Sequence, residues 1–279
     1  MINNVKTLAS VSAILSRGAR WYAQKGTAAN RGTTVFSLVG AVRNTGLVEV
    51  PLGTKLSDII YGIGGGIPDG RKLKAVQCGG PSGGMISAEN IDVLVDYEGL
   101  KKYGAMMGSG GLVVMDDSTC MVDIAKYFLK FLLEESCGKC TTCREGIERM
   151  HELVTKITEG KATIEDLGLL EELATVVRDT TMCGLGNTSP NPVLTTLRYF
   201  KPEYEAHILE KRCPAGVCKA LITYSIDPKK CTGCGACAKK CPEGAVSGRK
   251  KESHEIDAKK CIRCGVCQTT CKFGAVSRR

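Results

Sequence analysis

The sequence has no apolar run near the roughly 20 residues that a membrane-spanning helix needs. The best candidate, residues 128–133, is interrupted by Lys130 and followed by Glu134 and Glu135. The chain also lacks the apolar core of a secretory signal peptide. We therefore expect a soluble, cytoplasmic protein with no membrane span.

Aromatic residues are scarce, at 5% of the 279 residues, with one Trp in the whole chain. Residues 229–279 hold 13 basic and four acidic residues, but Phe273 is the only aromatic residue among them. Surfaces that bind single-stranded nucleic acid interleave aromatic and basic side chains. We therefore expect this positive charge to attract acidic proteins and not nucleic acid.

Cysteine, in contrast, is abundant, with 16 residues. In a small secreted protein this number would predict a framework of disulfides. In a chain of this length without a signal peptide, the thiols are instead expected to be metal ligands.

The C-terminal part contains an internal repeat. Residues 226–247 and 256–277 align with an offset of 30 residues and are identical at 13 of 22 positions, including all four cysteines of each copy. Each copy has the spacing CxxCxxCxxxC. A repeat of this kind indicates a duplicated supersecondary structure.

This spacing is typical of two iron–sulfur clusters, because the fourth cysteine of each run binds the other cluster. Zinc ribbons would instead need separate CxxC pairs. We assign the ligands of the first [4Fe–4S] cluster as Cys231, Cys234, Cys237 and Cys271, and those of the second as Cys261, Cys264, Cys267 and Cys241. Lys272 stands where bacterial two-cluster ferredoxins, which this segment resembles, usually have proline.

A third set of cysteines has the spacing CxxCxxC, with a fourth cysteine 40 residues later. Between them, apolar residues at helical spacing predict helices over 144–158 and 163–177, the second with a capping box of Thr163 and Asp166. A further helix over 121–133 is expected to be buried. The bundle would bring together the ligands of a third [4Fe–4S] cluster, or alternatively of a structural zinc: Cys137, Cys140, Cys143 and Cys183.

Three stretches carry a family resemblance: SCGKCTTCREG at 136–146, GLGN after Cys183, and GSGGLVVMDD at 108–117. They resemble the NADH-oxidising flavoprotein subunit of respiratory complex I and its soluble relatives, the NAD-linked hydrogenases and formate dehydrogenases. The ferredoxin-like extension resembles the β subunit of electron-bifurcating [FeFe] or [NiFe] hydrogenases. The resemblance covers nearly the whole chain.

The resemblance implies an α+β protein with a ubiquitin-like β-grasp module, an iron–sulfur helical bundle and a 2[4Fe–4S] ferredoxin domain. We expect these boundaries: 1–33 the end of a flavin domain, 34–84 β-grasp, 85–210 bundle, 211–225 a CPxGxC linker, and 226–279 ferredoxin-like. The family's flavin domain precedes the matched region, and no strand-linked GxGxxG is present. We therefore expect no FMN or NAD site in this chain.

Local patterns agree with a β-grasp module. Strand-like runs cover 35–42, 47–50 and 73–77, and Thr54 is expected to cap a short helix through Ile60. The glycine-rich segments 62–66 and 79–84 are expected to form turns and not a phosphate cradle.

The first 33 residues contain five basic and no acidic residues, a composition typical of a mitochondrial transit peptide. The family resemblance of residues 3–9 favours a docked helix over 7–22 instead. Its apolar residues would face inward: Leu8, Val11, Ile14 and Leu15.

Four cysteines remain. Cys213 and Cys218 form a CPxGxC loop, His207 precedes them, and Cys120 is the best fourth ligand of a zinc site, with Cys78 a weaker one. Alternatively, Cys120 is a small buried hydrophobe and His207 a surface residue. His151 and His254 have no cysteine pattern around them and are expected at the surface.

No residue is a persuasive acid, base or nucleophile, so no catalytic residue is assigned. We expect an electron-relay subunit with three [4Fe–4S] clusters and a candidate zinc. Its partners would be a flavin- or NAD-binding chain, a hydrogenase or formate dehydrogenase catalytic chain, a thioredoxin-like iron–sulfur chain, or a soluble ferredoxin. Two alternatives stay open: a split NADH dehydrogenase whose flavin domain is on another chain, and a structural adaptor with non-conducting clusters.

Overall fold

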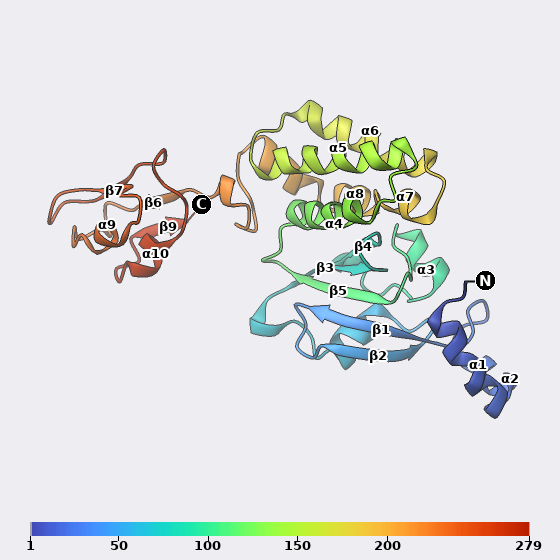
Figure 1. Cartoon of the computed structure of the whole chain (residues 1–279). Coiled ribbons are helices and arrows are strands. Elements are labelled where there is room, and N and C mark those ends of the chain that lie inside the picture. Colours follow the sequence, from blue (N-terminus) through green and yellow to red (C-terminus); the bar gives the residue numbers. More distant parts are fainter. Residues whose placement is uncertain (1, 279) are drawn as a thin grey trace.

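The computed structural model describes residues 2–278, which form a mixed sheet, a helical bundle stacked on it, and a small cysteine-rich unit beside them (Figure 1). The combination of helices and sheets confirms the predicted α+β class. None of the helices in the described residues is long and apolar enough to cross a membrane.

The mixed sheet has five strands in the order β2-β1-β5-β3-β4. The strands β1 and β5 are parallel, and the other neighbours are antiparallel. Their bounds are β1 Thr33–Gly40, β2 Gly46–Pro51, β3 Leu73–Cys78, β4 Gly84–Ser87 and β5 Gly111–Asp116. The sheet therefore extends beyond residue 84, the expected end of the β-grasp module, because β5 lies between β1 and β3.

The sheet packs on apolar residues from its connecting segments, including Leu56, Ile59 and Ile60, which are fully buried. The predicted helix here is a π-helix, Asp58–Ile63, and Thr54 does not cap it: the Thr54 hydroxyl donates to the Pro51 carbonyl at 2.7 Å. Short helices complete this unit: Pro68–Gly70, Ala88–Asn90 and α3 Tyr97–Lys102.

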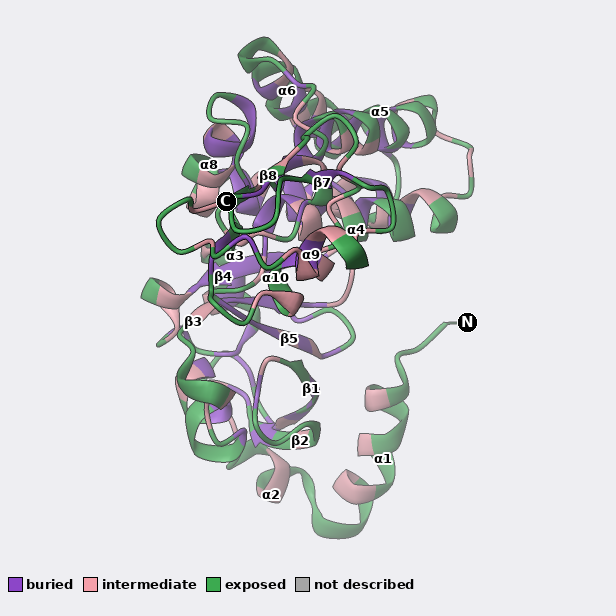
Figure 2. Ribbon diagram, turned by 90° about the vertical axis from the view of Figure 1, so that its left-hand side faces the viewer, coloured by how far each residue is buried: buried purple, intermediate pink, exposed green. Residues whose placement is uncertain are grey.

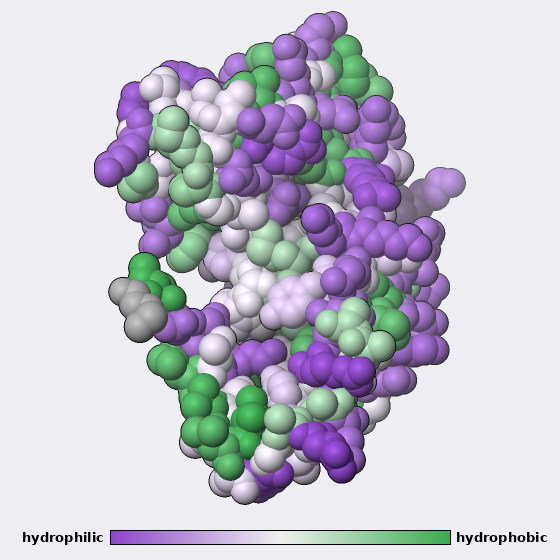
Figure 3. All heavy atoms as spheres, turned by 90° about the vertical axis from the view of Figure 1, so that its right-hand side faces the viewer, coloured by the Kyte–Doolittle hydropathy of each residue, from purple (hydrophilic) through white to green (hydrophobic). Residues whose placement is uncertain are grey.

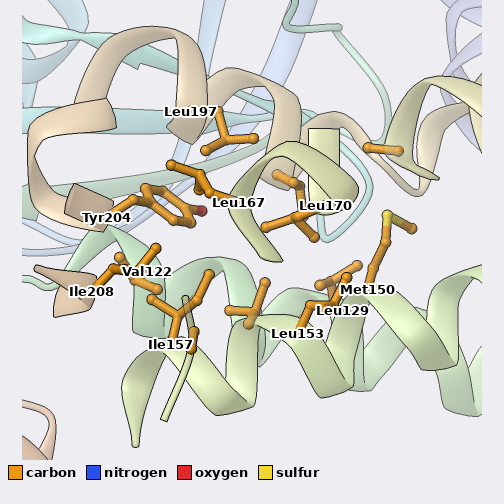
Figure 4. Packing of buried hydrophobic residues seen from close by; sticks show 14 of the residues in the cluster. Val122, Leu129, Met150, Leu153, Ile157, Leu167, Leu170, Leu197, Tyr204 and Ile208 are labelled. Atoms are coloured by element: carbon orange, nitrogen blue, oxygen red, sulfur yellow. The ribbon is translucent and has the colours of Figure 1, made fainter. Parts of the chain in front are cut away.

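The bundle consists of α4 Met121–Glu135, α5 Thr141–Thr158, α6 Ile164–Thr180, α7 Gly184–Thr188 and α8 Asn191–Ile208. The capping box of Thr163 and Asp166 is confirmed at the start of α6. Buried side chains of α4, α5, α6 and α8 meet in one core, in which Leu129, Leu153 and Leu170 face one another (Figure 4). The backbone N–H of Met85 in β4 donates to Thr195 Oγ1 of α8 at 3.0 Å, which joins bundle and sheet.

The cysteine-rich unit follows a short helix at Lys219–Leu221 and contains two small antiparallel ladders and two one-turn helices. The ladder partners are β6 Tyr224–Ile226 with β9 Val276–Arg278, and β7 Val246–Ser247 with β8 Glu255–Ile256. The helices are α9 Ala236–Lys240 and α10 Val266–Thr270. The start of each repeat is therefore paired with the end of the other.

The N-terminal helices α1 Val5–Arg17 and α2 Ala19–Ala23 contain no buried residue (Figure 2). The prediction that α1 buries its apolar side is wrong for Leu8, Val11 and Leu15, which are 59%, 46% and 79% exposed. Apolar side chains are exposed on this part of the surface (Figure 3). Residues of α1, α2, β1 and β2, together with residues 108–110, line a hollow of about 860 Å³.

Candidate iron–sulfur and metal centres

The bundle cysteines lie at the ends of helices. Cys137 is exposed in the loop between α4 and α5, Cys140 directly precedes α5, Cys143 lies in its first turn, and Cys183 directly precedes α7. The unpaired N–H groups at the start of an α-helix favour a nearby thiolate. Cys140 and Cys143 therefore begin α5 where a negatively charged ligand is stabilised.

Close packing of α5 against α6 lies between the first three cysteines and the segment that leads to the fourth. A Cβ atom on Gly146 would lie 2.3 Å from Val177 Cγ2, so the two helices touch where only glycine fits. Gly146 is one turn after Cys143, and Val177 is six residues before Cys183. The segment between is held by Asn187 Nδ2, which donates to the carbonyls of Arg178 and Thr181 at 2.8 and 2.9 Å.

In the cysteine-rich unit, one small cavity is lined by four cysteines, three from the first repeat and one from the second: Cys231, Cys234, Cys237 and Cys271. The β6–β9 ladder explains this arrangement, since it places the segment after Cys271 beside the segment before Cys231. Backbone N–H groups donate to the sulfur of the fourth cysteine in both repeats, Ala245 to Cys241 at 3.3 Å and Ala275 to Cys271 at 3.4 Å. Such hydrogen-bond donors orient a thiolate ligand and stabilise its negative charge.

The expectation that His254 is a surface group is wrong. His254 is 3% exposed and lines the same cavity. A hydrogen bond from its backbone holds the pKa of Cys231 below the ordinary value. In contrast, burial raises the pKa of the equivalent pair Cys237 and Cys267. His151, on α5, is half-buried.

A second kind of centre lies where α4, α8 and the CPxGxC loop meet. The ligand atoms of Cys120, His207, Cys213 and Cys218 all lie within 4.8 Å of one another, and all four residues are buried. Cys120 directly precedes α4, and His207 is in the last turn of α8. The structure thus brings together the four residues that the sequence singled out, and the surface alternative for His207 is wrong.

The dimensions of this set fit a tetrahedral metal ion. Two thiolates on one Zn²⁺ lie about 3.8 Å apart for a Zn–S bond of about 2.3 Å, and Cys120 Sγ lies 3.7 Å from Cys218 Sγ. His207 Nε2 is 3.4 Å from Cys120 Sγ and 3.3 Å from Cys218 Sγ. The other ring nitrogen, Nδ1, donates to the Glu203 carbonyl at 2.6 Å, which makes Nε2 the atom that would bind a metal.

Without a metal, these groups share protons. Burial opposes a charge on His207, but hydrogen bonds to Cys120 and Cys213 outweigh this effect and raise its pKa to about 10. Hydrogen bonds from Cys120 and Cys218 hold the pKa of Cys213 well below its ordinary value, and the pKa of Cys218 is raised in turn. Such a site already contains a thiolate and gives up protons when it binds a cation.

Cys78 is not part of this group. It lies in β3, fully buried in the core of the sheet unit, where burial raises its pKa to about 12. It is therefore a small core residue, and the proposal of Cys78 as a zinc ligand has no geometric support.

Three family models match the chain: the SLBB domain at residues 35–86, the NADH-ubiquinone oxidoreductase-F iron-sulfur binding region at 123–207, and a 4Fe-4S dicluster domain at 223–272. The second match spans the four bundle cysteines, and the third spans all eight cysteines of the repeat. The chain carries the iron–sulfur region of the NADH-oxidising oxidoreductase subunits. Of the four buried residues of the second centre, the three cysteines lie outside these matches: Cys120, Cys213 and Cys218.

Individual relatives agree with the matches to the family models. The chain is 52% identical over 254 residues to the NADP-reducing hydrogenase subunit HndC of Solidesulfovibrio fructosivorans, a match of 91% of this chain and 52% of that subunit. It is 41% identical over 214 residues to the F 2 subunit of the NADH-quinone oxidoreductase of Rhizobium meliloti. This match covers 77% of this chain and 51% of that subunit. The chain thus spans about half the length of these relatives.

A solved structure has the same fold. An NAD⁺-reducing [NiFe]-hydrogenase in the H₂-reduced state superimposes with a TM-score of 0.68 at 33% identity, covering 75% of this chain and 34% of that one. The matched iron–sulfur domains, together with this fold, identify the chain as an iron–sulfur electron-transfer region and confirm the family resemblance seen in the sequence.

Proposed function

We propose that this chain passes single electrons through three [4Fe–4S] clusters, within a multisubunit oxidoreductase linked to NAD(P) or ferredoxin, such as a bifurcating hydrogenase or a formate dehydrogenase. The observation that supports this proposal most directly is the cavity lined by cysteines of both repeats. When bound, such clusters supply one-electron oxidation and reduction. The chain's own residues hold the clusters, donate hydrogen bonds to the ligand sulfurs and limit the access of water.

The ligands of the bundle cluster are proposed to be Cys137, Cys140, Cys143 and Cys183. Those of the two ferredoxin clusters are Cys231, Cys234, Cys237 and Cys271, and Cys261, Cys264, Cys267 and Cys241. The exchanged β6–β9 and β7–β8 ladders support the crossed fourth ligands, because each exit strand lies against the other repeat.

We assign a structural zinc ion to Cys120, His207, Cys213 and Cys218. Three sulfurs, one imidazole, full burial and a tetrahedral spacing support this choice, since closed sites of this donor set are typical of zinc. The ion would join the bundle to the cysteine-rich unit through the CPxGxC loop.

We propose that the partners are other subunits of the complex and an acidic electron carrier of the ferredoxin type, in the cytoplasm. The lysines that precede the first cysteine of each repeat, Lys229, Lys230, Lys259 and Lys260, are exposed. Among residues 2–278, no ion pair involves a residue beyond Arg212, so these charges are available to a partner.

Metal analysis and spectroscopy of the anaerobically prepared chain test the relay. We expect about 12 iron and 12 sulfide per chain and EPR signals of three reduced [4Fe–4S] clusters after dithionite. Fewer than three clusters in the wild-type chain would overturn the proposal. Clusters that dithionite cannot reduce would instead support the adaptor alternative.

A pair of variants tests the crossed ligands. Cys271→Ser is expected to disturb the cluster of the first repeat, whose remaining ligands are Cys231, Cys234 and Cys237, and to leave the second cluster's signal unchanged. Cys78→Ala is the matched control, because Cys78 is a buried cysteine outside every proposed site. Loss of the second cluster's signal in the Cys271 variant would contradict the crossed assignment.

Charge reversal tests the acidic partner. Lys229→Glu with Lys230→Glu is expected to slow electron transfer to an acidic ferredoxin and to reduce its dependence on salt. Lys101→Glu with Lys102→Glu is the control, because these exposed lysines lie on α3 in the sheet unit. Equal rates for the two double variants would argue against this docking surface.

A further inference from the structure

A half-buried ion pair lies beside the four residues Cys120, His207, Cys213 and Cys218, here called the Cys120 tetrad. Lys74 Nζ of β3 lies 2.6 Å from Glu203 Oε1 of α8, with side chains only 15% and 13% exposed. Every other ion pair among residues 2–278 has at least one side chain that is more than 30% exposed. Most exposed ion pairs add little to stability. The low exposure of this pair therefore suggests a role other than stability.

Glu203 contacts one residue of the tetrad, His207, and the neighbour of another, Cys120, through different atoms. Its Oε2 accepts a hydrogen bond from the backbone N–H of Met121 at 3.1 Å, directly after Cys120. Its carbonyl accepts from His207 Nδ1 at 2.6 Å. One residue therefore holds the start of α4, where Cys120 lies, and the orientation of the imidazole.

Lys74 holds the other side of Cys120. Its ammonium group donates to the carbonyl of Thr119, the residue directly before Cys120, in addition to Glu203. The backbone of Cys120 is thus held on both sides, by Lys74 at Thr119 and by Glu203 at Met121. The Lys74 charge also offsets that of the Glu203 carboxylate, which is half-buried and would otherwise be unpaired.

We propose that Lys74 and Glu203 are positioning residues of the metal centre: they hold Cys120 and His207 in binding geometry and connect the centre to β3 of the sheet unit. This inference rests on the proposed zinc site. The partners that orient metal ligands commonly change metal affinity by about 10–100-fold when they are removed.

Zinc release from the full-length chain to a chromophoric chelator tests the role of the pair. Lys74→Met and Glu203→Gln are each expected to release zinc about 10–100-fold faster than wild type. Lys74→Arg keeps the charge and is expected to stay close to wild type. The control variants are Asp123→Asn and Lys126→Met, which break a more exposed ion pair on α4.

Cobalt substitution separates a positioning role from a general loss of stability. The d–d bands of bound Co²⁺ report ligand geometry, and we expect them to shift in Lys74→Met and Glu203→Gln but not in the control variants. Release rates and cobalt spectra equal to those of wild type would overturn this inference alone. A wild-type chain without stoichiometric zinc would overturn the zinc site as well.

Hydrogen exchange on the wild-type chain needs no variant. Removing zinc is expected to speed amide exchange in β3, at Leu73–Cys78, because Lys74 connects that strand to the centre. The edge strand β2 has no such connection and serves as the internal control. Unchanged exchange in β3 after zinc removal would contradict the connection.

Discussion

His254 and Tyr224 occupy equivalent places in the two repeats, 30 residues apart, and each lies beside the glycine that follows the second cysteine of the other repeat. A Cβ atom on Gly235 would lie 3.9 Å from His254 Nε2, and one on Gly265 would lie 2.8 Å from the Tyr224 hydroxyl. The repeat is therefore symmetric in its cysteines but not in the ring beside each proposed cluster.

Exchanging these rings should change one cluster at a time. We expect His254→Tyr to shift the reduction potential of the cluster held by Cys231, Cys234 and Cys237, since hydrogen bonding and burial around a cluster set its potential. Tyr224→His should act on the other cluster. Potentiometry followed by EPR measures both, and equal shifts of both clusters in either variant would contradict the assignment.

Gly146→Ala should destabilise the bundle. The added methyl would lie 2.3 Å from Val177 Cγ2, and overpacking of this kind costs about 1–3 kcal/mol, more than the roughly 1 kcal/mol that alanine gains in a helix. The EPR signal of the proposed bundle cluster should weaken as well, because Gly146 is one turn after Cys143 and Val177 is six residues before Cys183.

Gly168→Ala on α6 is the matched control, since a Cβ there meets no atom within 4 Å. It should leave stability unchanged or raise it by up to about 1 kcal/mol. Denaturant unfolding of both variants measures the difference. A Gly146 variant as stable as the Gly168 variant would show that the helices can separate without cost.

Zinc binding to the tetrad should depend on pH. The pKa of His207 is raised to about 10 without metal, so at neutral pH its ring carries a proton that zinc must displace. Apparent affinity should therefore fall as pH falls, by about tenfold per pH unit for each displaced proton. Calorimetry in buffers of different ionisation enthalpy counts the protons, and binding without proton release would disagree.

Cys78 should resist alkylation in the folded chain. Burial raises its pKa to about 12, so at a pH of about 8 almost none of it is thiolate, the reactive form. Mass spectrometry after iodoacetamide treatment of the metal-loaded protein should find Cys78 unmodified, and modified only after unfolding. Rapid labelling under native conditions would show that this core opens easily.

Much of the site could be predicted from sequence because ligand spacing is a local property. The CxxCxxC runs, the repeat offset and the capping box of Thr163 and Asp166 depend on residues a few positions apart. The sequence also singled out Cys120 and His207 as companions of the CPxGxC loop, because only a few cysteines and histidines remained after the cluster motifs.

The errors concern burial and long-range pairing. Leu8, Val11 and Leu15 have the helical spacing of a buried face, yet α1 is exposed, since spacing says which residues share a face and not whether another element covers it. His254 was expected at the surface because no local motif surrounds it. It is buried because the fold places it against the first repeat, beside Gly235 and in the cavity lined by Cys231.

The sequence alone determined which groups are available for metal chemistry: the cysteines at cluster spacing, the duplicated unit and the CPxGxC loop are each defined by residues a few positions apart. Only the tertiary structure decided which distant groups meet. The insertion of β5 between β1 and β3, the contact of Gly146 with Val177, and the hold of Lys74 and Glu203 on Cys120 join residues far apart in the chain. Such contacts form because whole helices and sheets bury their apolar faces together, and no local pattern encodes that packing.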